Sequence, residues 1–119
     1  MGVKQKLGAN GEEQVAQYLI KLGWKILDRN WRIRGGELDL VAANSQGLLI
    51  FIEVKTRSSL AFGDPLEAIN VEKALRIQRL ALAWMATNQR WGCNYRIDVA
   101  GVTASKTGEY AIDYREGVL

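Results

Sequence analysis

The chain has 119 residues, of which 48% are hydrophobic and 24% are charged, and this composition is typical of one soluble globular domain over residues 1–119. No apolar run is long enough to cross a membrane, the N-terminus lacks the apolar core of a signal peptide, and the single Cys93 excludes an internal disulfide, so we expect a cytoplasmic protein. Because the sequence holds no His, a histidine-based triad and a His-ligated zinc site are excluded. The net charge of +3 is compatible with a polyanionic partner but does not require one.

A first helix is predicted over residues 10–22. Asn10 can cap its start, and Gly23 follows its end. The apolar residues between them form one stripe on a helical wheel: Val15, Ala16, Leu19, Ile20 and Leu22. Glu12 lies near the middle of this stripe, where a carboxylate either satisfies free backbone amides at the helix start or serves a site. Both interpretations stay open.

Several strand-like segments separated by turn formers follow this helix. They cover residues 24–27, 31–33, 37–42 and 48–55. The sequence Asn44-Ser45-Gln46-Gly47 predicts a turn that joins the last two of these strands as an antiparallel hairpin. Residues 56–69, which include the only Pro, are expected to form a loop.

A long second helix is predicted from Asn70 to Asn88. Its core-facing stripe is expected to hold Val71, Ala74, Leu75, Ala81, Leu82 and Met85. Lys73, Arg76 and Arg79 stand three residues apart on the other side, as either a solvated face or a row of phosphate contacts.

Two more strands close the chain, over residues 95–102 and 110–114, with Asp98 expected to face solvent. The resulting order of elements is α-β-β-β-α-β-β. It predicts an α/β fold with a mixed central sheet flanked by two main helices.

Three charged residues stand out in the central hairpin: Asp39 in its first strand, and Glu53 and Lys55 in its second. Alternation puts Glu53 and Lys55 on one face of their strand, and antiparallel pairing brings Asp39 beside them. The opposite face of the second strand is apolar and carries Ile50, Ile52 and Val54. Carboxylates are ligands suited to Mg²⁺ or Mn²⁺, and a lysine beside them helps to orient or deprotonate a water. The pattern predicts a metal-assisted phosphodiesterase site, with an ordinary surface Glu–Lys pair as the alternative.

Short motifs spread over nearly the whole chain carry a family resemblance. They are Gly11-Glu12, Tyr18-Leu19, Asn30-Trp31-Arg32, Gly36-Glu37-Leu38-Asp39-Leu40, Phe51-Ile52-Glu53-Val54-Lys55-Thr56-Arg57, Phe62-Gly63, Glu67-Ala68 and Lys73. Together they resemble the small bacterial YraN-like family, which is grouped with archaeal Holliday-junction resolvases and restriction endonucleases by the PD-(D/E)xK motif. The resemblance implies a restriction-endonuclease-like fold, with Asp39 as the motif aspartate, Glu53 and Lys55 as the (D/E)xK pair, and Glu12 as a helix carboxylate brought to the metal. Leu38 stands where the family usually has Ile.

From the site pattern and the resemblance we expect a Mg²⁺-dependent endonuclease, with Mn²⁺ as a substitute, that hydrolyses phosphodiester bonds in structured or branched DNA. The nucleic acid is expected to contact Arg34, Thr56, Arg57, Lys73 and Arg76. A resolvase cuts two strands symmetrically, so such an enzyme would act as a homodimer. Two alternatives stay open: a nucleic-acid-binding module of the same fold without turnover, and an interaction protein with an exposed apolar patch around Trp84 and Trp91.

Overall fold

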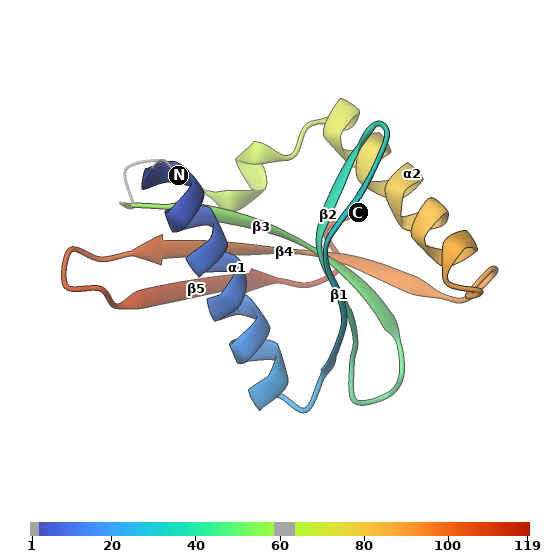
Figure 1. Cartoon of the computed structure of the whole chain (residues 1–119), viewed down its shortest axis with the longest axis horizontal. Coiled ribbons are helices and arrows are strands. Elements are labelled where there is room, and N and C mark those ends of the chain that lie inside the picture. Colours follow the sequence, from blue (N-terminus) through green and yellow to red (C-terminus); the bar gives the residue numbers. More distant parts are fainter. Residues whose placement is uncertain (1–2, 59–63) are drawn as a thin grey trace.

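The computed structural model describes residues 3–58 and 64–119, without the side chains of residues 3–9 and 68, and confirms the predicted element order (Figure 1). Within these residues, one sheet has the order β1-β2-β3-β4-β5, in which β3 and β4 are parallel and the other neighbours antiparallel. The strands are β1 (Lys25–Ile33), β2 (Gly36–Ala43), β3 (Leu49–Arg57), β4 (Tyr95–Ala104) and β5 (Tyr110–Arg115). The helices are α1 (Val3–Lys21), α2 (Val71–Thr87) and the short 3₁₀ helix η2 (Pro65–Ala68). The predicted α/β class, a mixed sheet with two main helices, is confirmed.

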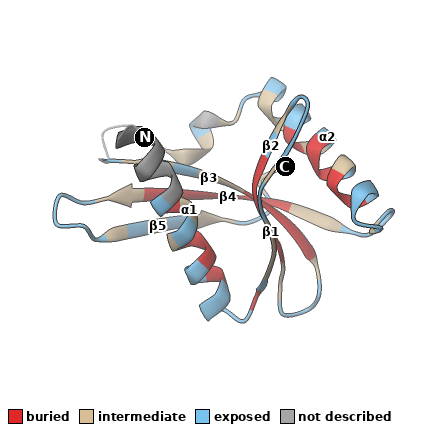
Figure 2. Cartoon of the chain, in the orientation of Figure 1, coloured by how far each residue is buried: buried red, intermediate tan, exposed pale blue. Residues whose placement is uncertain are grey.

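The two long helices cover opposite faces of the sheet (Figures 1 and 2). Alternate residues of β3 show this directly. Ile50 and Ile52 pack in one core cluster with Leu19 of α1, whereas Phe51 packs in the other cluster with Trp84 of α2. Both faces of β3 are therefore buried, which explains its continuous apolar run.

The turn between β2 and β3 forms as predicted. Asn44 Oδ1 accepts hydrogen bonds from the backbone N–H groups of Gln46 and Leu48, at 3.0 and 2.9 Å. Gly47 adopts a φ of +82°, which favours glycine. The sequence of this turn is thus sufficient to set the hairpin.

α1 begins at Val3, so the predicted start at Asn10 is wrong. Asn10 and Gly11 lie inside the helix, because tertiary packing overrides their weak helix propensity. Gly11 has a steric role there, since a Cβ at this position would lie 2.0 Å from Thr56 Oγ1. The predicted end is confirmed, as Gly23 adopts a φ of +88° just beyond the last turn.

The strand-like segments at residues 24–27 and 31–33 lie together in one strand, β1, which begins at Lys25. Its register with β2 shifts between Ile26 and Asp28, and Asn30 has a φ of +49°. These irregularities interrupt the alternation of side chains that predicts a strand, so a single irregular strand looked like two short ones.

The predicted loop over residues 56–69 is also shorter than expected. Thr56 and Arg57 extend β3, and residues 65–68 form η2. Residues 59–63 lie outside the described part of the chain. η2 and α2 together form the crossover that the parallel pairing of β3 and β4 requires.

α2 has the predicted ends but packs with a different face. Asn70 and Asn88 cap it as expected. The helix residues buried against the sheet are Ile77, Leu80, Ala81, Trp84 and Met85. Three residues predicted for the core are exposed instead: Val71, Leu75 and Leu82. Neither α2 nor any other helix in the described residues combines the length and apolar character needed to cross a membrane.

Candidate active site

The open end of the β2–β3 hairpin brings Asp39 and Glu53 together. The pair Leu40–Ile52 is the last of the ladder, so Asp39 and Glu53 come next on their strands. Beyond the ladder, a side chain makes the next hydrogen bond between the two strands: Asp39 Oδ2 accepts a hydrogen bond from the N–H of Val54 at 2.8 Å. The carboxylate of β2 is therefore tied to the backbone of β3.

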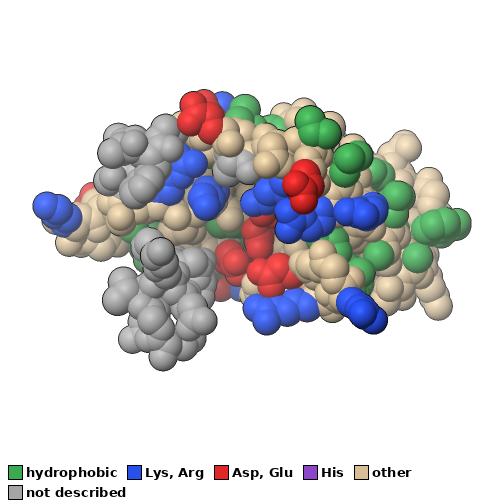
Figure 3. Space-filling view, turned by 90° about the horizontal axis from the view of Figure 1, so that it is seen from above, with side chains coloured by type: hydrophobic (Ala, Val, Ile, Leu, Met, Phe, Trp, Pro, Cys, Tyr) green, Lys and Arg blue, Asp and Glu red, His purple; other side chains and the backbone are tan. Residues whose placement is uncertain are grey.

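A pocket of about 240 Å³ opens over this pair, between the hairpin and α2. Its lining combines acids of β2 and β3 with cations and apolar residues of α2: Gly36, Glu37, Asp39, Glu53, Lys73, Arg76, Ile77 and Leu80. Figure 3 shows acidic side chains gathered in the middle of one face, with Lys and Arg side chains on both sides. The pocket thus places carboxylates beside a basic edge.

Burial makes the Asp39 carboxyl hard to ionise. The side chain is 8% exposed, and its burial, followed by the nearby charge of Glu53, raises the pKa of Asp39 to about 8. The hydrogen bond from Val54 opposes this rise without cancelling it. At neutral pH the pair does not carry its full negative charge unless a cation lies beside it.

Lys73 of α2 pairs with the second acid, and Asp39 keeps its raised pKa beside this ion pair. Lys73 Nζ lies 2.9 Å from Glu53 Oε1, and the two side chains are 29% and 16% exposed. A pairing this deep neutralises Glu53 within the protein. The sequence placed Lys73 either on a solvated face or in a row of phosphate contacts, whereas the structure places its ammonium beside Glu53.

Lys55, the lysine of the predicted motif, takes a different place. It is exposed, it does not line the pocket, and it forms no ion pair with another described residue. Strand alternation puts its side chain on the same face as Glu53. Of the predicted trio, the structure therefore brings Asp39 and Glu53 into the pocket and leaves Lys55 on the surface.

Glu12 approaches the same region from α1. It is half-buried, and burial together with the charge of Glu37 raises its pKa, while the Asn30 side chain opposes the rise. Its own charge also raises the pKa of Asp39, so these acids lie within electrostatic reach of one another. Among the described residues, no three acids are close enough to form a ready-made metal cluster. Asp39 and Glu53 are the pair best placed to hold an ion, which would keep several waters as Mg²⁺ prefers.

The residues predicted to contact nucleic acid divide into two groups. Arg34 and Arg76 are exposed and line pockets at the site. Thr56 and Arg57 are half-buried: Thr56 packs against Gly11, and Arg57 Nη2 donates to the carbonyl that precedes η2 at 3.4 Å. The first group is open to a ligand, whereas the second group is engaged within the protein.

Of the two tryptophans expected in an exposed apolar patch, one is buried and one is exposed. Trp84 is 2% exposed, and its Nε1 donates to Asp28 Oδ2 at 2.9 Å. Trp91 is 72% exposed. Trp84 is therefore a core residue, and the interaction-protein alternative loses half of its expected surface.

Comparison with known proteins identifies relatives along the whole chain. The model of the family described as "Uncharacterised protein family UPF0102" matches residues 11–102, which include the whole pocket. The chain is 44% identical to the UPF0102 protein of Trichlorobacter lovleyi over 110 residues, covering 92% of this chain and 87% of the relative. It is 45% identical to that of Nocardia farcinica over 119 residues, covering 100% and 93%. Among solved structures, SfsA of Pyrococcus furiosus in complex with Ca²⁺ has a TM-score of 0.43 and 16% identity, covering 95% of this chain and 63% of that chain.

Proposed function

The chain belongs to the UPF0102 family, and we propose that it is a metal-dependent endonuclease that hydrolyses phosphodiester bonds in DNA. The observation that carries this function is the buried carboxyl of Asp39 beside Glu53, in a pocket edged by Lys73 and Arg76. Two acids that resist joint ionisation indicate a place for a cation, and a basic edge suits a polyanion. An acid pair with a purely structural role would not need to line a pocket.

The chemistry of the donor set fits Mg²⁺ or Mn²⁺. Asp39 and Glu53 would hold the ion through carboxylate oxygens. The negative charge of Glu12 on α1, which already acts on Asp39, would add to the attraction for the cation. When bound, the ion supplies positive charge against the negative charge that builds up during hydrolysis. Its charge also favours the ionised form of Asp39, whose pKa is raised to about 8 without it.

Residues of α2 would position the phosphate. Lys73, once released from Glu53, would bring its ammonium to the phosphate oxygens, and Arg76 would bind them from the pocket edge. Ile77 and Leu80 form an apolar wall of the pocket, and this wall strengthens each charge interaction by excluding water. Lys55, on the exposed end of β3, would contact the phosphate or its water from the solvent side.

A finer part of the proposal concerns the substrate. Branched or otherwise structured DNA is proposed from the resemblance of the motifs to Holliday-junction resolvases. Symmetric cleavage of a junction would require two copies of the chain related by a two-fold axis. Plain duplex and single-stranded DNA are the comparison substrates.

A cleavage assay tests this function. Purified protein is incubated with labelled four-way junction, flap, duplex and single-stranded DNA in Mg²⁺ or Mn²⁺, beside Asp39→Asn and Glu37→Gln. Glu37 is the matched control, because it lines the same pocket but is exposed and paired with Arg32 at 2.6 Å. We expect Asp39→Asn to lose at least about 100-fold in cleavage rate while it still binds DNA, and Glu37→Gln to retain cleavage. Cleavage by Asp39→Asn at the wild-type rate would refute the assignment.

A second candidate is a nucleic-acid-binding module without turnover. The ion pair between Lys73 and Glu53 favours it, because a carboxylate that is already neutralised has less need of a metal ion. Salt-dependent DNA binding with no cleavage of any substrate in either metal would support this candidate over the nuclease.

A further inference from the structure

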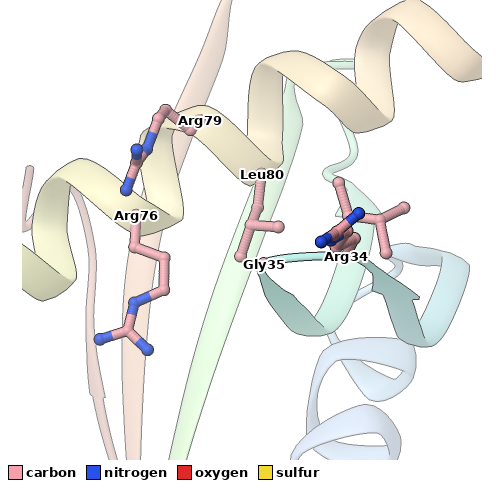
Figure 4. Close-up of a pocket in the computed structure, with 6 residues that line it drawn as sticks. Arg34, Gly35, Arg76, Arg79 and Leu80 are labelled. Atoms are coloured by element: carbon pink, nitrogen blue, oxygen red, sulfur yellow. The ribbon is translucent and has the colours of Figure 1, made fainter.

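A second pocket, next to the acidic one, is lined by three arginines. Its volume is about 200 Å³, and its lining is Ile33, Arg34, Gly35, Arg76, Arg79 and Leu80. Figure 4 shows Arg76 and Arg79 projecting from α2, with Leu80 between them and the hairpin turn that carries Arg34. None of the three guanidinium groups forms an ion pair with another residue in the described part of the chain.

The hairpin that carries Arg34 is packed closely on α2. Gly36 adopts a φ of +150°, and a Cβ there would lie 3.1 Å from Leu80 Cδ1 and 3.5 Å from Arg76 Cδ. This close contact between the β1–β2 turn and the helix sets where Arg34 lies relative to Arg76 and Arg79. The fold itself therefore holds three positive charges around one pocket.

Three like charges without counter-charges repel one another, and an anion between them reduces this repulsion. Guanidinium groups bind phosphate oxygens through paired, charge-assisted hydrogen bonds. Arg76 and Leu80 line the acidic pocket as well, so the two pockets share a wall. A phosphate in the arginine pocket would be a close neighbour of a phosphate at the acid pair.

We propose that Arg34, Arg76 and Arg79 form a second phosphate-binding subsite, which holds the phosphate next to the one that is cleaved on the same DNA strand. For its substrate this subsite rests on the proposed function. The strand would run from Asp39 and Glu53, past Arg76, towards the β1–β2 turn. Ile33, which is 42% exposed, would give the sugar between the two phosphates an apolar contact.

Fluorescence anisotropy with a short fluorescein-labelled duplex tests this subsite. The titrations are made in EDTA, so the outcome does not depend on cleavage, and they are repeated over a range of salt concentrations. We expect Arg34→Gln and Arg79→Gln each to weaken binding by about tenfold and to lower the salt slope by about one. Because both arginines hold the same phosphate, we expect the double variant to lose little more than either single variant.

Lys25→Gln is the matched control. Lys25 is exposed and pairs with Ala43, at the opposite end of the β1–β2 hairpin from the turn that carries Arg34, so its loss should leave DNA affinity and salt slope nearly unchanged. Two results would overturn the subsite: losses in Arg34→Gln and Arg79→Gln no larger than in Lys25→Gln, or losses that add fully in the double variant, which would mean separate phosphates. Loss of cleavage with this binding pattern intact would count against the nuclease and not against the subsite.

Discussion

Under the proposed function, a divalent ion would compete with Lys73 for the carboxylate of Glu53. The ammonium lies 2.9 Å from Glu53 Oε1, so an ion at this carboxylate has to displace the lysine or bind against its charge. The same displacement would free Lys73 for a phosphate. This single contact would therefore link metal binding at the acid pair to binding of the proposed substrate.

Substitution of this lysine is predicted to strengthen metal binding. Lys73→Met removes the competing charge while keeping an unbranched side chain, and we expect its affinity for Mn²⁺ to rise by up to about tenfold in isothermal titration calorimetry. Arg79→Met is the control, because Arg79 lies on the same helix and lines only the neighbouring pocket. Weaker Mn²⁺ binding by Lys73→Met than by the wild type would contradict the competition.

The raised pKa of Asp39 predicts how stability depends on pH in metal-free buffer. Between its ordinary value of 3.8 and about 8, the unfolded chain releases the Asp39 proton while the folded chain keeps it. A rise in pH within this window therefore lowers the free energy of unfolding, by at most about 1 kcal/mol per pH unit. Below the window both states hold the proton, and above it both have lost it, so the slope disappears.

Urea unfolding in EDTA at several pH values measures this effect, with Asp39→Asn as the reference that cannot titrate. We expect the wild type to lose stability relative to Asp39→Asn as the pH rises from 4 towards 8. A wild type that gains stability relative to this variant over the same range would show that the carboxyl is not held in its protonated form.

Asp39 and Glu53 could be placed together from the sequence, because the turn at residues 44–47 and strict alternation fix their relative positions. Lys73 and Asp98 could not. The place of Lys73 depends on how α2 is rotated against the sheet, and Asp98 alternates as an exposed residue would, yet it is fully buried. Whether a buried charged side chain has hydrogen-bond or ion-pair partners can be seen only from its neighbours in the folded structure.

At the level of whole elements, the contact between α1 and β3 positions Glu12. Gly11 packs directly on Thr56, with no room for a Cβ, and Glu12 is the next residue of the helix. Any side chain at Gly11 would push the helix away from the strand. The distance of the Glu12 carboxylate from the acid pair is therefore set by a glycine.

Gly11→Ala is predicted to destabilise the fold by about 1–3 kcal/mol, because its Cβ would lie 2.0 Å from Thr56 Oγ1. Thr56→Ala in the same chain removes that oxygen and should restore part of the loss. Thermal unfolding of both single variants and of the double variant measures the effect. Equal losses in Gly11→Ala with and without Thr56→Ala would exclude the steric cause.

A buried aspartate joins β4, β5 and the C-terminal segment. Asp98 is fully buried and accepts hydrogen bonds from Arg96 Nε at 2.8 Å, Tyr114 Oη at 2.6 Å and the N–H of Gly117 at 2.8 Å. We expect Asp98→Ala to lower the free energy of unfolding by about 3–5 kcal/mol, since it leaves Arg96 without its buried partner. Asp113→Ala, which removes an exposed carboxylate paired with its strand neighbour, should cost at most about 1 kcal/mol. Similar losses in these two variants under urea unfolding would show that the buried network does not stabilise the fold.

Elements with local signals were predictable, and elements that depend on packing were not. The ends of α2 and the turn at residues 44–47 are set by local hydrogen bonds of Asn side chains, and these residues can be identified in the sequence. The buried face of α2 cannot be identified in this way, because apolar residues occur almost all around the helix and more than one apolar stripe can be drawn on a helical wheel. The start of α1 was missed for a different reason: Asn10 is a favoured capping residue, yet the structure places it inside the helix.

At the scale of the whole molecule, the site exists only where four elements meet. α1 supplies Glu12, β2 supplies Asp39, β3 supplies Glu53, and α2 supplies Lys73 and Arg76. The net charge of +3 is modest, so the proposed attraction to DNA would depend on this local arrangement, in which basic side chains flank a group of acids (Figure 3). The same arrangement buries most of Asp39 and of the Glu53 side chain.

Titration of the protein with Mn²⁺, followed by electron paramagnetic resonance above pH 8, reports directly on whether Asp39 and Glu53 hold a divalent ion. At this pH the Asp39 carboxyl is mostly ionised, since its pKa is about 8. We predict a bound Mn²⁺ signal in the wild type and in Glu37→Gln, and its loss in Asp39→Asn and Glu53→Gln. Retention of the wild-type signal in Asp39→Asn would contradict a metal site at this pair.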